Sequence, residues 1–170
     1  AALQAHKEYS GKTEKPTPDD PDWSQWRRDQ VTDLVKNIFT EVKKIRPKAK
    51  VSAALICWGE CPQEFTDSLP YKKALQDWRR WFTEGYLDFA APMVYFNHEK
   101  NADMFKGWIA GFKRWRSRRP VYIGLYALIN TPENTLKQAK LSEQSQLGGW
   151  VLFHFNDGEL RESLKKVFGK

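Results

Sequence analysis

Short apolar segments alternate four times with helical patterns along this chain, and this alternation constrains the fold more than any other feature. The segments read VSAALICW, LDFAAPMVYF, VYIGLYALI and WVLFHF, and they begin at residues 51, 87, 121 and 150. Apolar runs with little alternation are typical of strands that are covered on both faces. Because strands and helices that alternate every 29 to 36 residues form parallel units, we predict an α/β fold with four neighbouring parallel strands and helices on the outer face.

Helical periodicity is clearest over residues 31–45, where apolar residues form one stripe before Pro47. We expect Asp22 to cap this helix, with Gln25 completing a capping box. Another helix is expected to start after Thr131 and to end at a pair of glycines. The remaining predicted helices lie near residues 3–9, 71–82, 104–112 and 160–168, and the glycine pair is Gly148 and Gly149.

Two architectures fit this alternation, a doubly wound open sheet and part of a (β/α)8 TIM barrel. A doubly wound nucleotide-binding sheet carries a glycine-rich loop after its first strand, but that loop reads WGECPQEF here. A complete barrel takes ~250 residues, or about 31 per unit. We therefore predict that residues 23–170 form the C-terminal half-barrel, and that residues 1–22 connect it to an N-terminal half upstream.

The composition, 41% hydrophobic and 29% charged, indicates a globular domain with a formal net charge of +7. A basic chain can indicate a nucleic-acid partner, but the lysines and arginines lie mostly on helical stretches and no nucleic-acid-binding motif accompanies them. We therefore predict no specific nucleic-acid partner. No apolar run approaches the ~18 residues of a membrane-spanning helix, so no membrane span is expected.

Cys57 and Cys61 are the two cysteines, and they are expected to be unpaired thiols. A zinc site would need further ligands at suitable spacing, but His6, His98 and His154 are scattered along the chain. We predict no metal site and no cofactor.

Ligands of parallel β/α folds bind at the loops that follow the strands. Those loops combine aromatic, amide and acidic side chains, and the chain has eight tryptophans. Aromatic faces suit the C–H patches of sugars, and amides and carboxylates suit their hydroxyls. The expected glycan-binding residues are Trp58, Tyr95, Asn97, Asn130 and Asn156, and the candidate catalytic carboxylates are Glu60 and Asp157.

Each candidate also has a purely structural interpretation. Trp58 and Tyr95 suit closure of the barrel core equally well. Asp157 suits a cap of the last helix, and a loop carboxylate such as Glu60 is usually solvated. Asp77 is expected in mid-helix, in an ion pair with a neighbouring arginine.

Two stretches of the sequence carry a family resemblance. They read DWSQWRRDQVTDLVKNIFTEVKKIRPKAKVSAALICWG and YKKALQDWRRWFTEGYLDFAAPMVYF. Their order of a W-R-R helix, an I-x-P lead-in, a W-G turn, D-W-R-x-W, E-G-x-L-D and a P-M-x-Y strand resembles the bacterial glycosyl hydrolase-like family ten over roughly residues 20–155.

The resemblance implies a (β/α)8 barrel in an exported or envelope-attached enzyme that acts on glycans, and some members are similar to hydrolases of peptidoglycan strands that lack stem peptides. It also implies an acidic D-G-x-x-x-D-Y motif upstream of this segment. By position, Trp58, Gly59, Asp77 and Tyr95 match the family pattern.

Three functions remain open: the substrate-side half of a glycoside hydrolase, a non-catalytic carbohydrate-binding half-barrel, and an unrelated α/β binding domain. The expected partners are a glycan and either the N-terminal half-barrel or a second copy of the chain. The expected location is extracellular or at the cell envelope. The chain alone is expected to be inactive.

Overall fold

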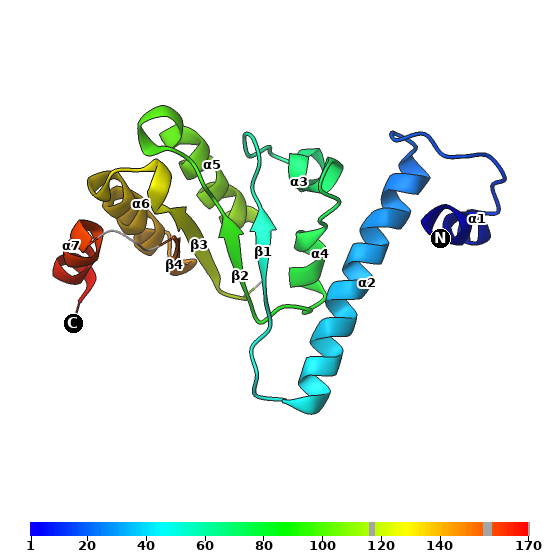
Figure 1. Cartoon of the computed structure of the whole chain (residues 1–170), viewed down its shortest axis with the longest axis horizontal. Coiled ribbons are helices and arrows are strands. Elements are labelled where there is room, and N and C mark those ends of the chain that lie inside the picture. Colours follow the sequence, from blue (N-terminus) through cyan, green and yellow to red (C-terminus); the bar gives the residue numbers. More distant parts are fainter. Residues whose placement is uncertain (116–117, 155–157, 170) are drawn as a thin grey trace.

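A computed structural model describes residues 1–115, 118–154 and 158–169 of the chain. Its centre is a parallel sheet in which each strand pairs with the next one along the sequence (Figure 1). The predicted α/β fold with four neighbouring parallel strands is therefore confirmed. The strands are β1 (Ser52–Ile56), β2 (Phe89–Met93), β3 (Val121–Tyr126) and β4 (Gly148–Phe153).

Helices connect the strands and also precede and follow the sheet. The helix expected near residues 3–9 is present and packs on the long helix that follows it. The helices are α1 (Ala2–Ser10), α2 (Pro21–Ile45), α3 (Leu69–Lys72), α4 (Trp78–Thr83), α5 (His98–Trp115), α6 (Pro132–Gln144) and α7 (Gly158–Phe168), with short 3-10 turns η1 (Phe65–Asp67) and η2 (Ala127–Ile129).

The start of α2 differs from the prediction. Asp20, not Asp22, is the capping residue, and its side chain accepts a hydrogen bond from the Trp23 N–H at 3.0 Å. Pro21 occupies the first helical turn, where its missing N–H costs nothing because that group would have no partner in the helix. The cap therefore lies directly before the proline.

The single helix expected over residues 71–82 is wrong. The structure has two short helices, α3 and α4, separated at Leu75, whose φ is 59°. Asp77 caps α4 by accepting the Arg80 N–H at 3.4 Å, so it is not a mid-helix residue. The break has a clear cause, since Gln76 in the gap accepts a hydrogen bond from the Ile56 N–H of β1 at 2.9 Å.

Gly148 and Gly149 begin β4 and do not end a helix, which corrects another expectation. Their φ values are 154° and 122°, a region that side chains disfavour. A Cβ on Gly148 would lie 3.0 Å from the Val121 carbonyl oxygen. The glycines therefore let β4 start close against β3.

One face of the sheet is covered by helices and holds the core. Leu55, Ala90, Ile123 and Leu125 alternate along the strands and are fully buried on this face. Aromatic side chains of α4 and α5 cover these residues. Trp78 of α4 stacks on Phe112 of α5 and packs against Phe65. Trp108 and Trp115 complete this aromatic cluster. Burying each large apolar side chain contributes on the order of 2 kcal/mol.

The opposite face of the sheet is open. Ser52, Ala54, Val151 and Phe153 point to it from the two edge strands and are exposed. Helices on one face and an uncovered second face match part of a (β/α)8 barrel, in which the second face is the interior. The division between a connector, residues 1–22, and a half-barrel, residues 23–170, stays a prediction.

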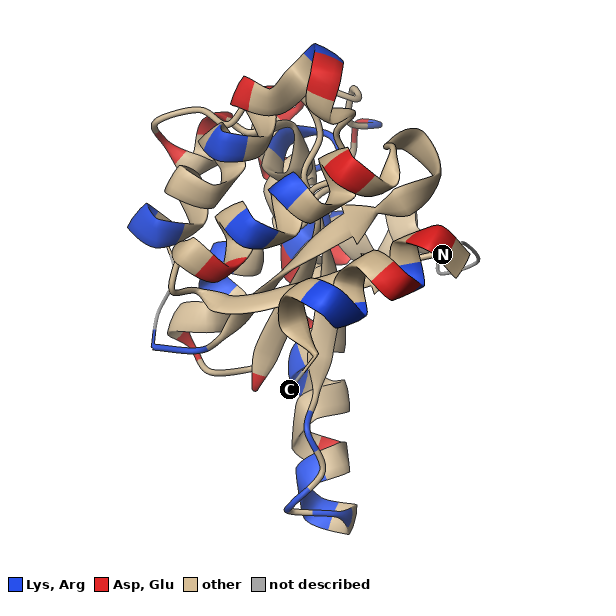
Figure 2. Cartoon of the chain, turned by 90° about the vertical axis from the view of Figure 1, so that its left-hand side faces the viewer, with Lys and Arg blue, Asp and Glu red and all other residues tan. Residues whose placement is uncertain are grey.

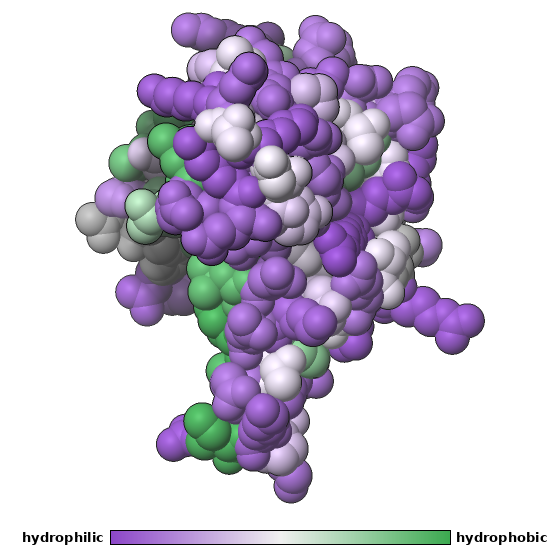
Figure 3. Space-filling view, turned by 90° about the vertical axis from the view of Figure 1, so that its right-hand side faces the viewer, coloured by the Kyte–Doolittle hydropathy of each residue, from purple (hydrophilic) through white to green (hydrophobic). Residues whose placement is uncertain are grey.

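The long helix α2 stands at the side of the sheet and is only partly covered (Figure 1). Leu34, Ile38 and Ile45, which belong to its predicted apolar stripe, are exposed. Figure 3 shows hydrophobic surface on this side that continues to the projecting end of the molecule, among mainly hydrophilic side chains. Basic residues also gather at that projecting end (Figure 2), and they are Lys43, Lys44, Arg46, Lys48 and Lys50.

Candidate functional site

An aromatic cluster lies at the carboxyl end of the sheet, on its open face. Tyr126 ends β3 and Phe153 ends β4, and the register pairs the two residues. Tyr95 follows β2, and its ring stacks on that of Phe153 with centroids 5.4 Å apart and an interplanar angle of 22°. Tyr126 lies 5.4 Å from both rings. We call Tyr95, Tyr126 and Phe153 the rim cluster.

Tyr95 reaches Phe153 by crossing over β3, and Gly124 makes this crossing feasible. A Cβ on Gly124 would lie 2.4 Å from the Pro92 carbonyl oxygen and 3.2 Å from a carbon of the Tyr95 ring. Glycine is therefore required for strands β2 and β3 to keep this spacing while the tyrosine lies across them.

The rim cluster combines aromatic surface with hydroxyl groups. Phe153 is 54% exposed, and both tyrosines are partly exposed. Burial raises the pKa of Tyr95, and the neighbouring Cys57 and Tyr126 raise it further. The Tyr95 phenol thus stays protonated at neutral pH, where it can donate and accept hydrogen bonds.

Trp58 follows β1 at the same end of the sheet and is 52% exposed. The next residue, Gly59, has a φ of 67°, and its carbonyl oxygen accepts a hydrogen bond from Trp108 Nε1 at 2.9 Å. A Cβ on Gly59 would lie 2.9 Å from Leu69 Cδ1. The turn that presents Trp58 is therefore fixed from beneath by the core.

Asn97 and Asn130 join the loops after β2 and β3. The Asn97 side chain donates to the Ile129 carbonyl oxygen at 2.5 Å and accepts N–H bonds from the first turn of α5. The Asn130 side chain accepts the His98 N–H at 2.7 Å and donates to two backbone carbonyls at 3.1 and 3.2 Å. Two of the three predicted ligand-binding amides, Asn97 and Asn130, are thus engaged in holding the rim together.

Of the two candidate catalytic carboxylates, Glu60 lies among the described residues and Asp157 does not. Glu60 is exposed and makes no hydrogen bond or ion pair with another described residue. Asn156 and Asp157 lie outside the described residues. His154 directly follows β4 and has a φ of 64°, a strained backbone conformation for a residue with a side chain.

Many of the aromatic side chains that suggested a sugar-binding site pack in the core instead. Five of the eight tryptophans that favoured a glycan site are packing residues, since Trp26, Trp78, Trp81, Trp108 and Trp115 are buried. Trp58 is the one exposed tryptophan among the described residues. The sequence analysis did not name Phe153 as a site residue. The alternation of side chains along a strand could have indicated it, because Val151 and Phe153 lie two positions apart and therefore on the same face of the strand.

Cys57 and Cys61 are both free, as predicted. Burial raises the pKa of both thiols, that of Cys57 strongly.

Among the described residues, no three His, Cys, Asp or Glu side chains form a group that could hold a metal ion. None of the described helices is long and apolar enough to cross a membrane.

Parallel β/α units with an exposed aromatic rim at the strand carboxyl ends define part of a β/α barrel with its candidate site in the usual place. The family model described as glycosyl hydrolase-like 10 matches residues 2–142. The chain therefore belongs to the glycosyl hydrolase-like 10 family, as the sequence motifs predicted.

Individual relatives agree with this assignment. The chain is 30% identical over 162 residues to the glycosyl hydrolase YngK of Bacillus subtilis (strain 168), and the match covers 85% of this chain and 31% of that protein. It is 28% identical over 113 residues to the glycosyl hydrolase DigH of Escherichia coli (strain K12), covering 60% of this chain and 25% of that protein. The chain thus spans about a third or less of the length of these relatives.

Proposed function

We propose that this chain contributes the glycan-binding C-terminal half of the barrel of a glycoside hydrolase. The substrate of the whole protein would be a bacterial cell-wall or other polysaccharide. The observation that carries the proposal is the exposed rim cluster, because it lies where β/α barrels bind their substrates. Aromatic rings there can pack on the C–H faces of sugars, while the tyrosine hydroxyls bind sugar hydroxyls.

We propose that catalysis requires a longer protein than this chain. Glycosidases use two carboxylates about 5 to 9.5 Å apart. Glu60 and Asp157 stay the candidates within the chain, whereas the family resemblance puts an acidic motif upstream. We therefore expect the chain to bind glycans without cleaving them, and the longer protein to hydrolyse them. An extracellular or envelope location is part of the same proposal, since it rests on the resemblance.

The proposal is tested by titrating the chain with chitotetraose and following its tryptophan fluorescence at submicromolar protein concentration. Removing one ring of the rim cluster by Phe153→Ala should weaken binding about tenfold, equivalent to about 1.4 kcal/mol. The control is Ile45→Ala, which removes an exposed apolar side chain at the far end of α2. Equal affinities of all three proteins, or no binding, would contradict the proposed site.

A second assay separates the enzyme from the non-catalytic carbohydrate-binding half-barrel. The chain and a longer protein that includes the upstream half are incubated with cell-wall glycan, and released sugar ends are measured. Hydrolysis by the longer protein supports the enzyme. Binding by both without hydrolysis by either supports the non-catalytic alternative.

A further inference from the structure

A groove runs between α5 and α6 on the helix-covered side of the sheet, away from the rim cluster. Two adjoining cavities of about 320 and 220 Å³ form it, and they share Lys106 of α5 with Leu141 and Gln144 of α6. Figure 2 faces the side of the molecule on which α5 and α6 lie. We call it the lysine groove, after the four lysines that line it: Lys106, Lys113, Lys137 and Lys140.

The charge along the lysine groove is positive. None of the described residues that line it is acidic. Lys113 and Lys140 form no ion pair with a described residue. Glu143, which follows Lys140 on α6, is turned toward the start of β4, since its Oε1 would lie 3.5 Å from a Cβ on Gly149. Two cations thus face the groove without a compensating acid.

The other two lysines of the groove belong to exposed ion pairs. Lys106 pairs with Asp103 at 3.3 Å, and Lys137 pairs with Glu133 at 2.8 Å. All four side chains are at least half exposed. Because exposed pairs of this kind contribute little, an anion that meets several lysines at once can displace these acids.

The lysine groove lacks the surface that a protein or a nucleic acid would need. Its floor is aliphatic but covered, since Ile109 is buried and Leu141 is half-buried, and no large hydrophobic side chain of α5 or α6 is exposed. An amphipathic helix would need such side chains to dock on. No aromatic ring lines the groove among the described residues, whereas single-stranded nucleic acids stack their bases on such rings. The lining therefore favours a polyanion without bases.

The spacing of the lysines favours a polymer over a single anion. Lys106 and Lys113 are seven positions apart on α5, which separates them by about 10 Å along the helix axis. One phosphate cannot reach both, but a chain of phosphodiesters can contact them in turn. Lysine binds phosphate as a point charge, and the C–H groups of a polyol between phosphates suit the aliphatic floor.

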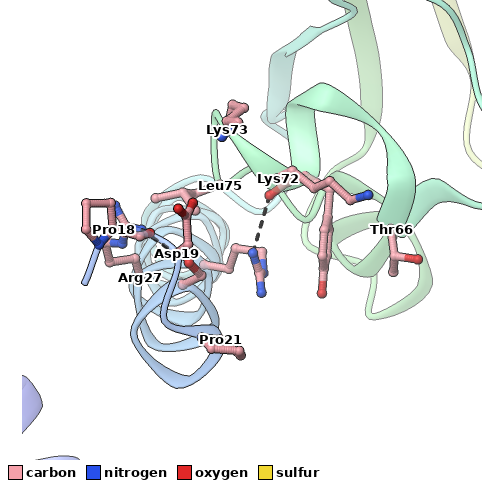
Figure 4. Close-up of a pocket in the computed structure, with 11 residues that line it drawn as sticks. Pro18, Asp19, Pro21, Arg27, Thr66, Lys72, Lys73 and Leu75 are labelled. Atoms are coloured by element: carbon pink, nitrogen blue, oxygen red, sulfur yellow. Dashed lines mark hydrogen bonds between the residues drawn. The ribbon is translucent and has the colours of Figure 1, made fainter. Parts of the chain in front are cut away.

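A larger cavity, of about 560 Å³, has a different place in the molecule. It lies between the start of α2 and α3, and Figure 4 shows Arg27 and Lys72 on its two sides, with Asp19 also in its lining. The segment that contains α3 follows the loop that carries Trp58, so this cavity adjoins the proposed glycan site. The lysine groove instead lies on the outer surface of the helices, and both of its walls belong to the described chain.

We propose that the lysine groove binds a linear polyol phosphate, which holds the protein on a phosphate-bearing polymer while the rim cluster stays free. The inference goes beyond the proposed function, and neither depends on the other. Lys113 and Lys140 supply the uncompensated charges. Lys106 and Lys137 join them when phosphate displaces their carboxylate partners.

The test titrates end-labelled poly(glycerol phosphate) with the whole chain at submicromolar concentration and follows the fluorescence anisotropy. Added salt should weaken the binding, and monomeric glycerol phosphate should compete only at far higher phosphate concentration. Combining Lys113→Gln with Lys140→Gln should weaken the binding about tenfold. The matched control combines Lys48→Gln with Lys50→Gln, which removes the same charge from the exposed loop before β1 and should change the affinity less than about twofold.

Each outcome bears on the groove. Equal weakening by the two double variants would mean that affinity follows net charge alone and would overturn the proposal, as would absence of binding by the unmodified chain. A single-stranded polynucleotide that binds as tightly would overturn the assignment to a polyol phosphate. Lys113→Gln alone provides a second variant if the double variant alters the circular dichroism spectrum. Chitotetraose binding should be the same in the groove variant, so the proposed function is tested separately.

Discussion

At the scale of single residues, Gly124 links the fold to the candidate site. The change Gly124→Ala should destabilise the protein by about 1–3 kcal/mol, because the added methyl group meets the Pro92 carbonyl oxygen at 2.4 Å. It should also displace Tyr95 and weaken chitotetraose binding. Urea unfolding and fluorescence titration measure the two effects. Gly158→Ala is the control, since no described residue beyond its chain neighbours lies within 4 Å of the added group, and an equal loss of stability in both variants would refute the packing argument.

Asp88 provides a residue-scale test of electrostatics at the opposite end of the sheet. Its carboxylate is 8% exposed, accepts the Val51 N–H at 2.7 Å, and pairs with Lys43 at 2.8 Å and Arg119 at 3.6 Å. Burial by itself would raise the pKa of Asp88, but the bonds from Lys43 and Val51 outweigh it and lower that pKa.

A carboxylate whose pKa is lowered by folding stabilises the protein above its unfolded pKa of about 3.9, and this contribution is lost as the pH falls through the folded pKa. Asp88→Asn should therefore cost about 1–3 kcal/mol at pH 7 and clearly less near pH 3. Urea unfolding at both pH values measures the difference. Glu41→Gln, which removes an exposed ion pair with Lys44, should cost under about 0.5 kcal/mol, and a pH-independent loss in Asp88→Asn would contradict the assignment.

At the scale of elements, local patterns predicted the strands but not every helix. The strands were recognisable because apolar residues face both the helices and the open side of the sheet. The break between α3 and α4 was not, because it depends on a tertiary hydrogen bond from Ile56 to Gln76. The helix end predicted at Gly148 and Gly149 was wrong for the same reason. Glycine is needed at these positions because of the close approach of the neighbouring strand β3, which is a tertiary contact.

The Gln76 side chain is predicted to protect the edge of β1. Gln76→Leu removes the acceptor of the Ile56 N–H and should cost about 1–3 kcal/mol. The Ile56 amide should then exchange its hydrogen faster, which deuterium exchange with NMR detection measures. Gln30→Leu, at an exposed position of α2, serves as the control. Unchanged protection of Ile56 would mean that this edge is held by other contacts.

At the scale of the whole molecule, topology was the predictable part of the site. Parallel strands bring their following loops to one edge, so Trp58, Tyr95 and Asn130 were expected there and lie there. The stacking of Tyr95 on Phe153 was not predictable, because it needs the strand register and the space at Gly124. The pocket between the start of α2 and the α3 region was not predictable for a similar reason, since its nearest lining residues from the two segments, Arg28 and Thr66, are 38 positions apart.

The open sheet face makes a prediction about the state of the chain in solution. Val151 and Phe153 expose apolar surface on this face, and β1 and β4 are both edge strands with one neighbour each. Large apolar patches and unpaired strand edges normally recruit a partner. We therefore expect the isolated chain to form dimers or larger assemblies, or to aggregate, at micromolar concentration, as measured by light scattering.

A pair of variants identifies the surface responsible. Val151→Glu places a charge on the open sheet face at an exposed position, so it should reduce association without disturbing the helix-covered core. Ile45→Glu places the same charge at the far end of α2 and should leave association unchanged. A cooperative monomer in the unmodified chain would mean that the open face needs no partner. If Ile45→Glu reduced association and Val151→Glu did not, α2 would be the contact surface. The open sheet face would then need no second half-barrel to cover it.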